Sequence, residues 1–585
     1  MVDYLFHVLI LIGIFSILGV TFNFVVGYGG IMSLAHAVFF GVGAYTSALL
    51  AIHWRLVYPV TLIGGILLAG LTGAFFIVLL RKLRGDYLII ATLGLQIATG
   101  NVFLNWKSVT QGDVGLIGIP RPEFFGFQCT SKGSYLILTI ILTAICFTMI
   151  WWLVSSPFGR TLKAIRDDEI GTQSLGKNIP SYRVTTFALS AALAAIAGSL
   201  YAHYICYINP LDFTVHDSIM ILIIVIFGGF GNIWGAIPGS IFLVALPEAL
   251  RFVPMVSIYV PQLRTIFFSV ALLLIIYFRP QGLLGERLLF IRPSAGKEPT
   301  TLDDPGSRLI LQPQRLVSLL GQDGVNPQDS NMPIMKVSHL SKSFGGLKAV
   351  DDVSFAVMPG KEITGIIGPN GAGKTTLFNL ICGYLRMDEG EVYIKEQNVT
   401  KLSPHEIARL GVGRVFQDLH LFGQMSVLDN VIAAIQKPSE DENLIWMFTS
   451  APRLYRQNKL YREKGHYLLE CLGLADRRNE MAGKLSHAEQ KLLAIARLLA
   501  SECNFFLLDE LASGLDSSSI HALTKLLRGI AESGRKVCLV EHNLDFVRET
   551  VDNVLFLDQG RLIAEGRTEQ IVSDKKLAQI YFGGV

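Results

Sequence analysis

Residues 368–376 read Gly-Pro-Asn-Gly-Ala-Gly-Lys-Thr-Thr. The stretch fits the phosphate-loop pattern of glycine, four residues and then Gly-Lys-Ser/Thr. Its glycines let successive backbone N–H groups curl around an anion, its lysine reaches the terminal phosphates, and the hydroxyl that follows can bind magnesium. An apolar run at residues 362–367 suits a buried strand, and residues 375–382 have the spacing of a helix, whose N-terminus would hold phosphate. The sequence therefore predicts an α/β nucleotide-binding domain, and a glycine turn without a ligand explains the three segments poorly.

Charge divides the chain into two parts. Residues 1–290 contain 27 of the 97 charged residues, and the other 70 lie in residues 291–585. A membrane span needs about 20 largely apolar residues. About nine such runs can be placed before residue 291, near residues 4–22, 31–51, 58–80, 87–104, 134–154, 184–207, 218–230, 234–250 and 260–278. We therefore expect a polytopic α-helical membrane domain at residues 1–290.

Basic connections predict the orientation of these spans. They lie at residues 81–84, 160–183 and 279–292, and all three fall on one side of the bilayer if the N-terminus is outside. That arrangement places the C-terminal half in the cytoplasm, where ATP is. The first apolar run has no basic lead and is expected to be a retained span. We therefore expect a multi-pass protein of the inner (cell) membrane with a cytoplasmic ATPase.

The two halves are joined by a polar stretch. Residues 291–332 are rich in Pro, Gly, Asp and Ser, which predicts a flexible cytoplasmic linker before a nucleotide-binding domain at residues 333–585. The seven cysteines lack the pair spacing of a metal site. The net charge of +3 is small and reflects the bias of cytoplasmic loops rather than binding to nucleic acid.

The soluble half contains further candidate catalytic residues. Residues 505–510 read Phe-Phe-Leu-Leu-Asp-Glu, an apolar strand that ends in two carboxylates. Asp509 is then expected to support magnesium beside the phosphate loop, and Glu510 to lie next to the water that attacks the γ-phosphate. Gln417 and His542 are weak signals alone, because a single Gln or His is usually an ordinary hydrogen-bonded polar residue.

The order and spacing of these motifs resemble the nucleotide-binding domain of ABC transporters over residues 335–585. The resemblance implies that Phe344 stacks on adenine, that Gln417 contacts magnesium and the membrane domain, and that His542 is the switch histidine. It implies ATP and Mg²⁺ as cofactors and Glu510, His542 and Gln417 as catalytic residues. The ATP-binding residues would be Phe344, Gly368, Pro369, Asn370, Gly371, Ala372, Gly373, Lys374, Thr375 and Thr376, with Thr375, Gln417 and Asp509 as magnesium ligands.

One motif departs from the family pattern. Residues 485–490, Leu-Ser-His-Ala-Glu-Gln, would be the signature motif, whose Ser486 serves the ATP bound on a partner domain. Ala488 stands where the pattern has its second glycine and Glu489 where it has glutamine, and Leu511 replaces a usual proline. If the backbone at residue 488 needs a positive φ, alanine would cost about 1 kcal/mol. The weakened site would be the partner's.

The apolar half resembles the M-type permease of the branched-chain amino acid ABC importers. The matching stretches are residues 23–37, 40–46, 84–88, 92–94, 115–120 and 278–285. The soluble half is similar to the G-type ATPase of the same system at residues 342–350, 416–418 and 580–585. The resemblance implies a fusion that powers uptake of branched-chain amino acids or related solutes. Its partners would be an H-type permease and an F-type ATPase or a second copy, an extracytoplasmic binding protein and the lipid bilayer.

Three alternatives stay open. The solute could be urea, a short amide or another small carboxylate. An exporter half-transporter would have about six long spans instead of nine short ones. A subunit of another class would bind ATP but be catalytically impaired.

Two other features of the membrane half have candidate roles. Residues 156–176 are similar to the loop that importer permeases insert into a groove of the ATPase near Gln417; the alternative is a solvated acidic loop at residues 167–169. Glycine-rich breaks at residues 27–30 and 228–231 are candidates for discontinuous helices around a path. Polar residues within the spans, namely Asn23, His36, Gln96 and Asn101, should face a cavity or another helix.

Overall fold

The computed structural model describes residues 2–124, 127–250, 266, 269–270, 272–275, 277–285, 332–437 and 451–582. The chain forms two compact units. The first comprises Met1–Arg166 and Pro180–Arg292, and the second comprises Asp167–Ile179 and Pro293–Val585. A 13-residue segment from the N-terminal half is therefore part of the second unit. The predicted linker at residues 291–332 lies, except for Met332, outside the described residues.

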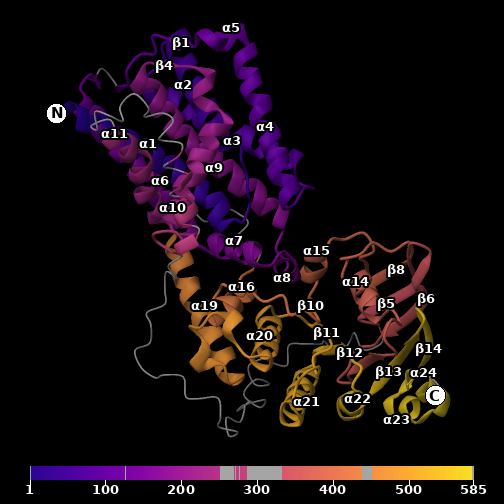
Figure 1. The fold of residues 1–585 in the computed structure, drawn as a ribbon. Helices are drawn as coiled ribbons and strands as arrows, with labels where there is room; N and C mark the ends of the chain where they lie inside the picture. The colour runs from indigo at the N-terminus through magenta and orange to yellow at the C-terminus, as the bar shows by residue number, and fades with distance from the viewer. Residues whose placement is uncertain are drawn as a thin grey trace. The chain divides into compact units, whose positions relative to one another are not determined.

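The first unit is a helical bundle (Figure 1). Its helices are α1 (Val2–Asn23), the π-helix η1 (Phe24–Tyr28), α2 (His36–Trp54), α3 (Tyr58–Leu79), α4 (Asp86–Asn105), α5 (Lys107–Thr110), α6 (Lys132–Ser155), α7 (Pro157–Asp167), α9 (Ile179–Ile205), α10 (Val215–Gly228) and α11 (Ala236–Leu250). Short strand pairs connect some of them, β1 (Leu116–Ile117) with β4 (Tyr207–Ile208) and β2 (Glu123–Phe124) with β3 (Phe127–Gln128).

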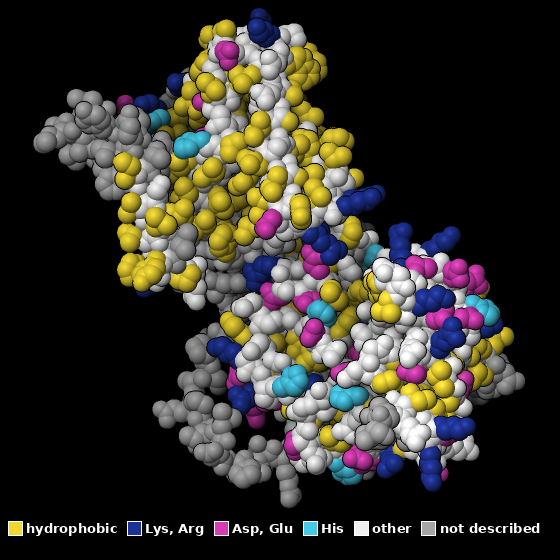
Figure 2. Space-filling model, turned by 45° about the vertical axis from the view of Figure 1, so that its right-hand side comes forward, with side chains coloured by type: hydrophobic (Ala, Val, Ile, Leu, Met, Phe, Trp, Pro, Cys, Tyr) yellow, Lys and Arg dark blue, Asp and Glu magenta, His cyan; other side chains and the backbone are white. Residues whose placement is uncertain are grey.

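The surface of this unit is that of a membrane protein. On α3, Leu67, Leu71 and Phe75 are 62%, 68% and 63% exposed, and Figure 2 shows hydrophobic side chains over this part of the molecule. Such exposed apolar area is costly in water and favourable in lipid. The faces of α3 and α4 therefore suit contact with acyl chains.

The expected count of about nine spans is not confirmed. Among the described residues, six helices are long and apolar enough to cross a membrane, or up to seven if a bent pair is one span. The runs predicted at residues 218–230 and 234–250 are that pair, α10 and α11, which is bent by 118° at a short break. Glycines and Asn232 at the break stop either helix from reaching a full span. The run predicted at residues 260–278 lies largely outside the described residues.

The second unit contains two sheets. The larger has the order β10-β11-β12-β7-β13-β14 and is parallel except for β14. Its strands are β7 (Thr364–Ile367), β10 (Val412–Val415), β11 (Phe505–Asp509), β12 (Lys536–Val540), β13 (Asn553–Asp558) and β14 (Arg561–Arg567). The smaller is antiparallel in the order β6-β5-β8-β9, with β5 (Met335–Phe344), β6 (Leu347–Val357), β8 (Glu389–Ile394) and β9 (Gln397–Asn398).

Helices cover both faces of the parallel sheet. Phe506 and Leu508 enter one hydrophobic core and Phe505 and Leu507 the other, as expected of a strand buried on both sides. The helices of this unit are α8 (Glu169–Ser174), α14 (Lys374–Ile381), α15 (Pro404–Arg409), α16 (Val427–Ile435), α19 (Ala451–Cys471), α20 (His487–Ala500), α21 (Ser517–Glu532), α22 (Leu544–Thr550), α23 (Thr568–Ser573) and α24 (Lys575–Phe582). Parallel order brings the carboxyl ends of β7, β10, β11 and β12 to one edge, where the candidate catalytic residues lie.

Candidate ATP site and its contact with the N-terminal half

The phosphate loop connects β7 to α14. Gly373 precedes the helix with φ +94°, and a Cβ there would clash with the carbonyl oxygen of Ala349. Only glycine combines that conformation with this close approach. The first N–H groups of α14 consequently lie at the end of a short glycine loop, the usual arrangement for binding an anion.

Lys374 rests on the loop that it terminates. Its Nζ donates to the carbonyl oxygens of Gly368 at 2.8 Å and Pro369 at 2.9 Å, and the side chain is buried. Burial lowers the pKa of Lys374, and the charges of Glu510 and Asp509 oppose that effect. The ammonium thus contacts the loop carbonyls and is stabilised in its charged form by the two carboxylates.

Asp509 is buried at the end of β11. Its Oδ2 is 3.2 Å from Nη2 of Arg414, whereas Oδ1 has no hydrogen-bond partner in the described part of the chain. Burial raises the pKa of Asp509, and Arg414 works against the rise. An orphaned buried carboxylate oxygen fits a cation ligand, because such atoms are normally paired. Together with the hydroxyl of Thr375, exposed in the first turn of α14, it fits Mg²⁺ completed by phosphate oxygens and water.

Three candidate catalytic residues lie together. Gln417 donates from Nε2 to Oε2 of Glu510 at 2.9 Å, and Nδ1 of His542 is 3.9 Å from Oε1 of the same carboxylate. Glu510 has φ +50°, an uncommon value for a side chain of this kind, and its N–H donates to the carbonyl oxygen of Val540. The strand end therefore holds Glu510 between the glutamine and the histidine, although these two come from loops 125 residues apart.

Phe344 and Ser486, expected to bind adenine and the partner's ATP, contact side chains close to them in the sequence. Phe344 ends β5, is 46% exposed and has Nζ of Lys342 5.6 Å from its ring centroid. Ser486 is the N-cap of α20 and forms a capping box with Glu489. The Glu489 carboxylate accepts from both the N–H and the hydroxyl of Ser486, each at 2.9 Å. The signature serine is thus bonded within its own helix.

Glu541 and Lys491 were not singled out from the sequence. Glu541 precedes His542, is 1% exposed and accepts the N–H of Ala512 at 2.8 Å. Lys491 of α20 donates to the carbonyl oxygens of Leu511 at 2.8 Å and of Ser513. Both side chains hold the residues that follow Glu510. Their only sequence signal was a charge at the edge of an apolar run.

Glu541 gives a prediction for stability. Burial raises its pKa to about 7 from an ordinary value of 4.5. Because the folded chain then binds the proton more tightly than the unfolded chain, stability should be lost as pH rises from 4.5 through about 7. The full-length protein should unfold at a lower temperature at pH 8 than at pH 5, and Glu541→Gln should reduce that difference. An equal difference in Glu541→Gln and in Glu532→Gln, a control at an exposed glutamate at the end of α21, would contradict the assignment.

Residues 167–179 contact the ATPase within the second unit. α8 begins after Asp168, whose Oδ1 accepts the N–H of Gly171 at 2.5 Å. Its Oδ2 is 2.7 Å from Nδ1 of His420, three residues after Gln417. A Cβ on Gly171 would clash with the carbonyl oxygen of His420. Helix α8 therefore lies directly on the loop that begins with the candidate catalytic glutamine.

The acidic run at this position does not simply face water. Asp167 accepts the N–H of Gln424 at 2.8 Å through Oδ2. Although burial raises the pKa of Asp168, hydrogen bonds from His420 and from the N–H of Gly171, together with the nearby charge of Arg497, lower it overall. The solvated-loop alternative is therefore wrong for both aspartates.

Arg497 joins α20 to this contact. It is 5% exposed, and its guanidinium donates to the carbonyl oxygens of His420 at 2.7 Å and Gly171 at 3.2 Å. The same group lies 4.3 Å from the ring centroid of Phe422. Burial lowers its pKa to about 10, so it stays charged at neutral pH. Helix α20 thus has Ser486 at its start and holds α8 near its end.

Two further cations hold the end of the segment. Nζ of Lys177 donates to the carbonyl oxygen of Gln436 at 2.7 Å, and Nε of Arg409 donates to that of Gly176 at 2.8 Å. Lys177 is only 1% exposed. Buried lysine is rare unless it is paired, so this contact is specific.

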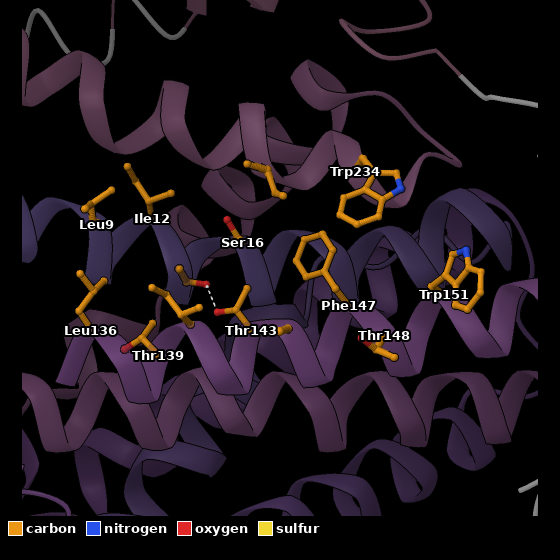
Figure 3. A pocket seen from close by; sticks show the side chains of 14 residues that line it. Leu9, Ile12, Ser16, Leu136, Thr139, Thr143, Phe147, Thr148, Trp151 and Trp234 are labelled. Atoms are coloured by element: carbon orange, nitrogen blue, oxygen red, sulfur yellow. Dashed lines mark hydrogen bonds between the residues drawn. The ribbon is translucent and has the colours of Figure 1, made fainter. Parts of the chain in front are cut away.

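The first unit has a cavity of about 600 Å³ along α1, α6 and the start of α11 (Figure 3). Phe147, Trp151 and Trp234 are at one end of it. Its polar lining consists of hydroxyls, from Ser16, Thr139, Thr143 and Thr148, and no described lining residue is charged. The cavity can therefore accept an aliphatic group, and its hydroxyls can hydrogen-bond a polar group, but its described lining offers no charged partner.

Comparison with known proteins places both halves. Residues 4–277 match the family model described as "Branched-chain amino acid transport system / permease component", and residues 350–513 match that of "ABC transporter". The soluble half is 34% identical to the probable branched-chain amino acid transport ATP-binding protein LivG of Archaeoglobus fulgidus, over 43% of this chain and 96% of that protein. It is 32% identical to the high-affinity branched-chain amino acid transport ATP-binding protein LivG of Escherichia coli (strain K12), over 43% and 99%. A crystal structure of a nucleotide-free ATP-binding cassette from an ABC transporter is 32% identical over 43% of this chain and 100% of its own, with a TM-score of 0.38.

An ATP-binding cassette and a permease in one polypeptide define an ABC transporter, in which ATP hydrolysis drives transport across a membrane. Within that class, the chain belongs to the branched-chain amino acid transport family and joins a permease component to an ATP-binding component. The six or seven candidate spans among the described residues leave the exporter alternative open, and the permease match favours the importer over it.

Proposed function

We propose that this chain is one half of an importer that takes up branched-chain amino acids across the inner (cell) membrane. The relatives' names support the solute class, and the hydroxyl-bearing apolar cavity suits an aliphatic side chain. One observation carries the coupling to ATP. Gln417 contacts Glu510, and three residues later His420 contacts Asp168 of the segment contributed by the N-terminal half.

The candidate site residues then have the following roles. The N–H groups of the phosphate loop and Lys374 hold the ATP phosphates, and Phe344 stacks on adenine. Thr375, Gln417 and Asp509 hold Mg²⁺, which would neutralise developing phosphate charge. Glu510 accepts the proton of the attacking water, and His542 helps to orient it.

A second half completes the transporter. Ser486 faces outward from its helix start and would serve ATP bound on a partner ATPase, either an F-type subunit paired with an H-type permease or a second copy. An extracytoplasmic binding protein would deliver the solute. We propose that residues 1–290 form the permease, 291–332 the linker and 333–585 the ATPase, with residues 167–179 docked on the latter.

The solute is tested by uptake into proteoliposomes. The full chain, with its partner subunits and binding protein, should accumulate labelled leucine only with ATP and Mg²⁺ on the ATPase side. Excess isoleucine or valine should compete, and urea or acetamide should not. Competition by urea or acetamide alone would favour the amide alternative, and ATP-independent accumulation would contradict the proposal.

The capping box predicts that the negative charge of Glu489 disfavours binding of the partner's ATP at Ser486. Two unit charges about 4 Å apart interact by about 1 kcal/mol in water, so Glu489 should repel a γ-phosphate brought to Ser486. Glutamine keeps the capping box without the charge. Glu489→Gln should therefore raise ATP turnover about fivefold, since 1.4 kcal/mol is tenfold, and Ala488→Gly should raise it or leave it unchanged.

Glu480 provides a matched control for this prediction. It pairs with Arg477 at 2.9 Å, and Arg477 also lies 3.6 Å from Glu489. Glu480→Gln should leave turnover within about twofold. A large loss in Glu489→Gln or Ala488→Gly would show that the altered signature is not a weakened one.

A further inference from the structure

Two helix breaks of the permease are joined by one side chain. Asn23, 1% exposed, ends α1 where it becomes the π-helix η1. Its Nδ2 donates to the carbonyl oxygens of Asn232 at 2.9 Å and Gly229 at 3.3 Å, and its Oδ1 accepts the N–H of Gly231 at 3.0 Å. These three partners form the break between α10 and α11. The glycine runs singled out from the sequence are therefore one junction, which we call the break junction: Asn23–Gly30 with Gly228–Asn232.

The backbones at this junction are in direct contact. A Cβ on Gly27 would come within 2.5 Å of the N–H of Gly231 and would clash with the side chain of Asn23. A Cβ on Gly228 would clash with the carbonyl of Gly235 across the bend. Close packing of this kind does not deform smoothly, so a shift of one break must move the other.

Arg166 reaches the same junction from α7. Its Nη1 donates to the carbonyl oxygen of Gly27, inside the π-helix, at 2.6 Å. Gly30 has φ +65°, and a Cβ there would lie 2.9 Å from Cγ of Arg166. A π-helix closes its hydrogen bonds one residue further along the chain than an α-helix, and such turns are rare and frequent at functional sites. Arg166 thus holds a carbonyl of an irregular turn.

Arg166 directly precedes, in the sequence, the segment that contacts the ATPase. Arg166 is the last residue of the first unit before the segment at residues 167–179. The next two residues, Asp167 and Asp168, are bonded to Gln424 and His420 of the ATPase. One or two peptide bonds therefore join Arg166 to the two aspartates that bind the loop after Gln417.

We propose that the break junction is the hinge of the permease and that Arg166 and Asn23 are its positioning residues. Arg166 passes movement of the ATPase loop to the carbonyl of Gly27, and Asn23 passes it on to the break between α10 and α11. This inference rests on the proposed ATP-driven transport and adds the residues through which it is transmitted.

The test compares uptake with ATP hydrolysis in the reconstituted complex. Arg166→Gln removes the charged donor and should lower leucine uptake at least tenfold while basal ATP hydrolysis stays within twofold. Arg166→Lys keeps a cationic donor and should recover part of the uptake. Arg81→Gln, at an exposed arginine after α3, should match the wild type in both measurements.

Asn23→Asp supplies a second, nearly isosteric variant. It loses both Nδ2 donors but keeps the acceptor for Gly231, so the ratio of uptake to hydrolysis should fall as in Arg166→Gln. Wild-type ratios in Arg166→Gln and Asn23→Asp, or a parallel fall of uptake and hydrolysis in folded protein, would overturn the hinge. Failure of the wild type to take up leucine would instead refute the proposed function, so the two failures are distinguishable.

Discussion

Replacing Glu510 by glutamine should lower ATP turnover by at least about 100-fold, the usual contribution of a general base. Glutamine has the same shape and can keep the hydrogen bond with Gln417 that the carboxylate makes at 2.9 Å. It cannot accept the proton of an attacking water. ATP binding should be retained, because the phosphate loop and Lys374 are unchanged. Leucine uptake should fall in the same proportion as hydrolysis.

The loss of turnover in Glu510→Gln should be most complete when the partner is a different ATPase, because this chain's altered signature would serve the partner's ATP. If Glu489 weakens the signature as proposed, the partner's own ATP, which would face Ser486 and Glu489, should not compensate for the loss. Glu549→Gln, which changes an exposed glutamate paired with His521 at 2.7 Å, is the control. Uptake that continues undiminished in Glu510→Gln would favour the catalytically impaired alternative.

Replacing Gly171 by leucine should separate hydrolysis from transport. A Cβ at this position would clash with the carbonyl oxygen of His420 and lie 3.3 Å from Nη2 of Arg497, so α8 could not stay on the ATPase. The backbone of Gly171 does not need a positive φ, so leucine is excluded by space rather than by conformation. Uptake should fall at least tenfold, whereas ATP hydrolysis should persist because Glu510 and the phosphate loop are untouched.

Asp168→Asn is a milder version of the same change. It keeps the shape but loses a charge-assisted hydrogen bond to His420, which is worth about 1.5–3 kcal/mol. It should give an intermediate loss of uptake. Gly94→Leu is the control, since nothing lies within 4 Å of a Cβ on that exposed glycine of α4. Normal uptake in Gly171→Leu would show that this contact does not couple the two activities.

The phosphate loop and the strand before Glu510 were predictable because their signals are local. The predicted strand at residues 362–367 is β7 at Thr364–Ile367, and the predicted helix from residue 375 is α14 at Lys374–Ile381. Each prediction needed only the spacing of neighbouring residues. The number of spans was harder to predict, because hydropathy does not show that α10 and α11 bend by 118° at a glycine break.

Buried charges whose hydrogen-bond partners are distant in the sequence could not be predicted, for a different reason. Arg497 lies on the apolar face of α20, and its partner Gly171 is 326 residues earlier in the chain. Glu541 and Lys177 also look like isolated charges in the sequence. Nothing local indicates which carbonyl oxygens or N–H groups will satisfy them, although a buried charge must find such partners.

By itself, the sequence determined that this protein joins an apolar helical half to an ATP-binding α/β half, because composition, hydrophobic spacing and the phosphate loop are properties of contiguous residues. Only the tertiary structure decided that residues 167–179 belong with the ATPase and that Asn23 joins two helix breaks more than 200 residues apart. Those contacts depend on hydrogen-bond direction and on the space left by glycines, and both are set when distant segments pack together.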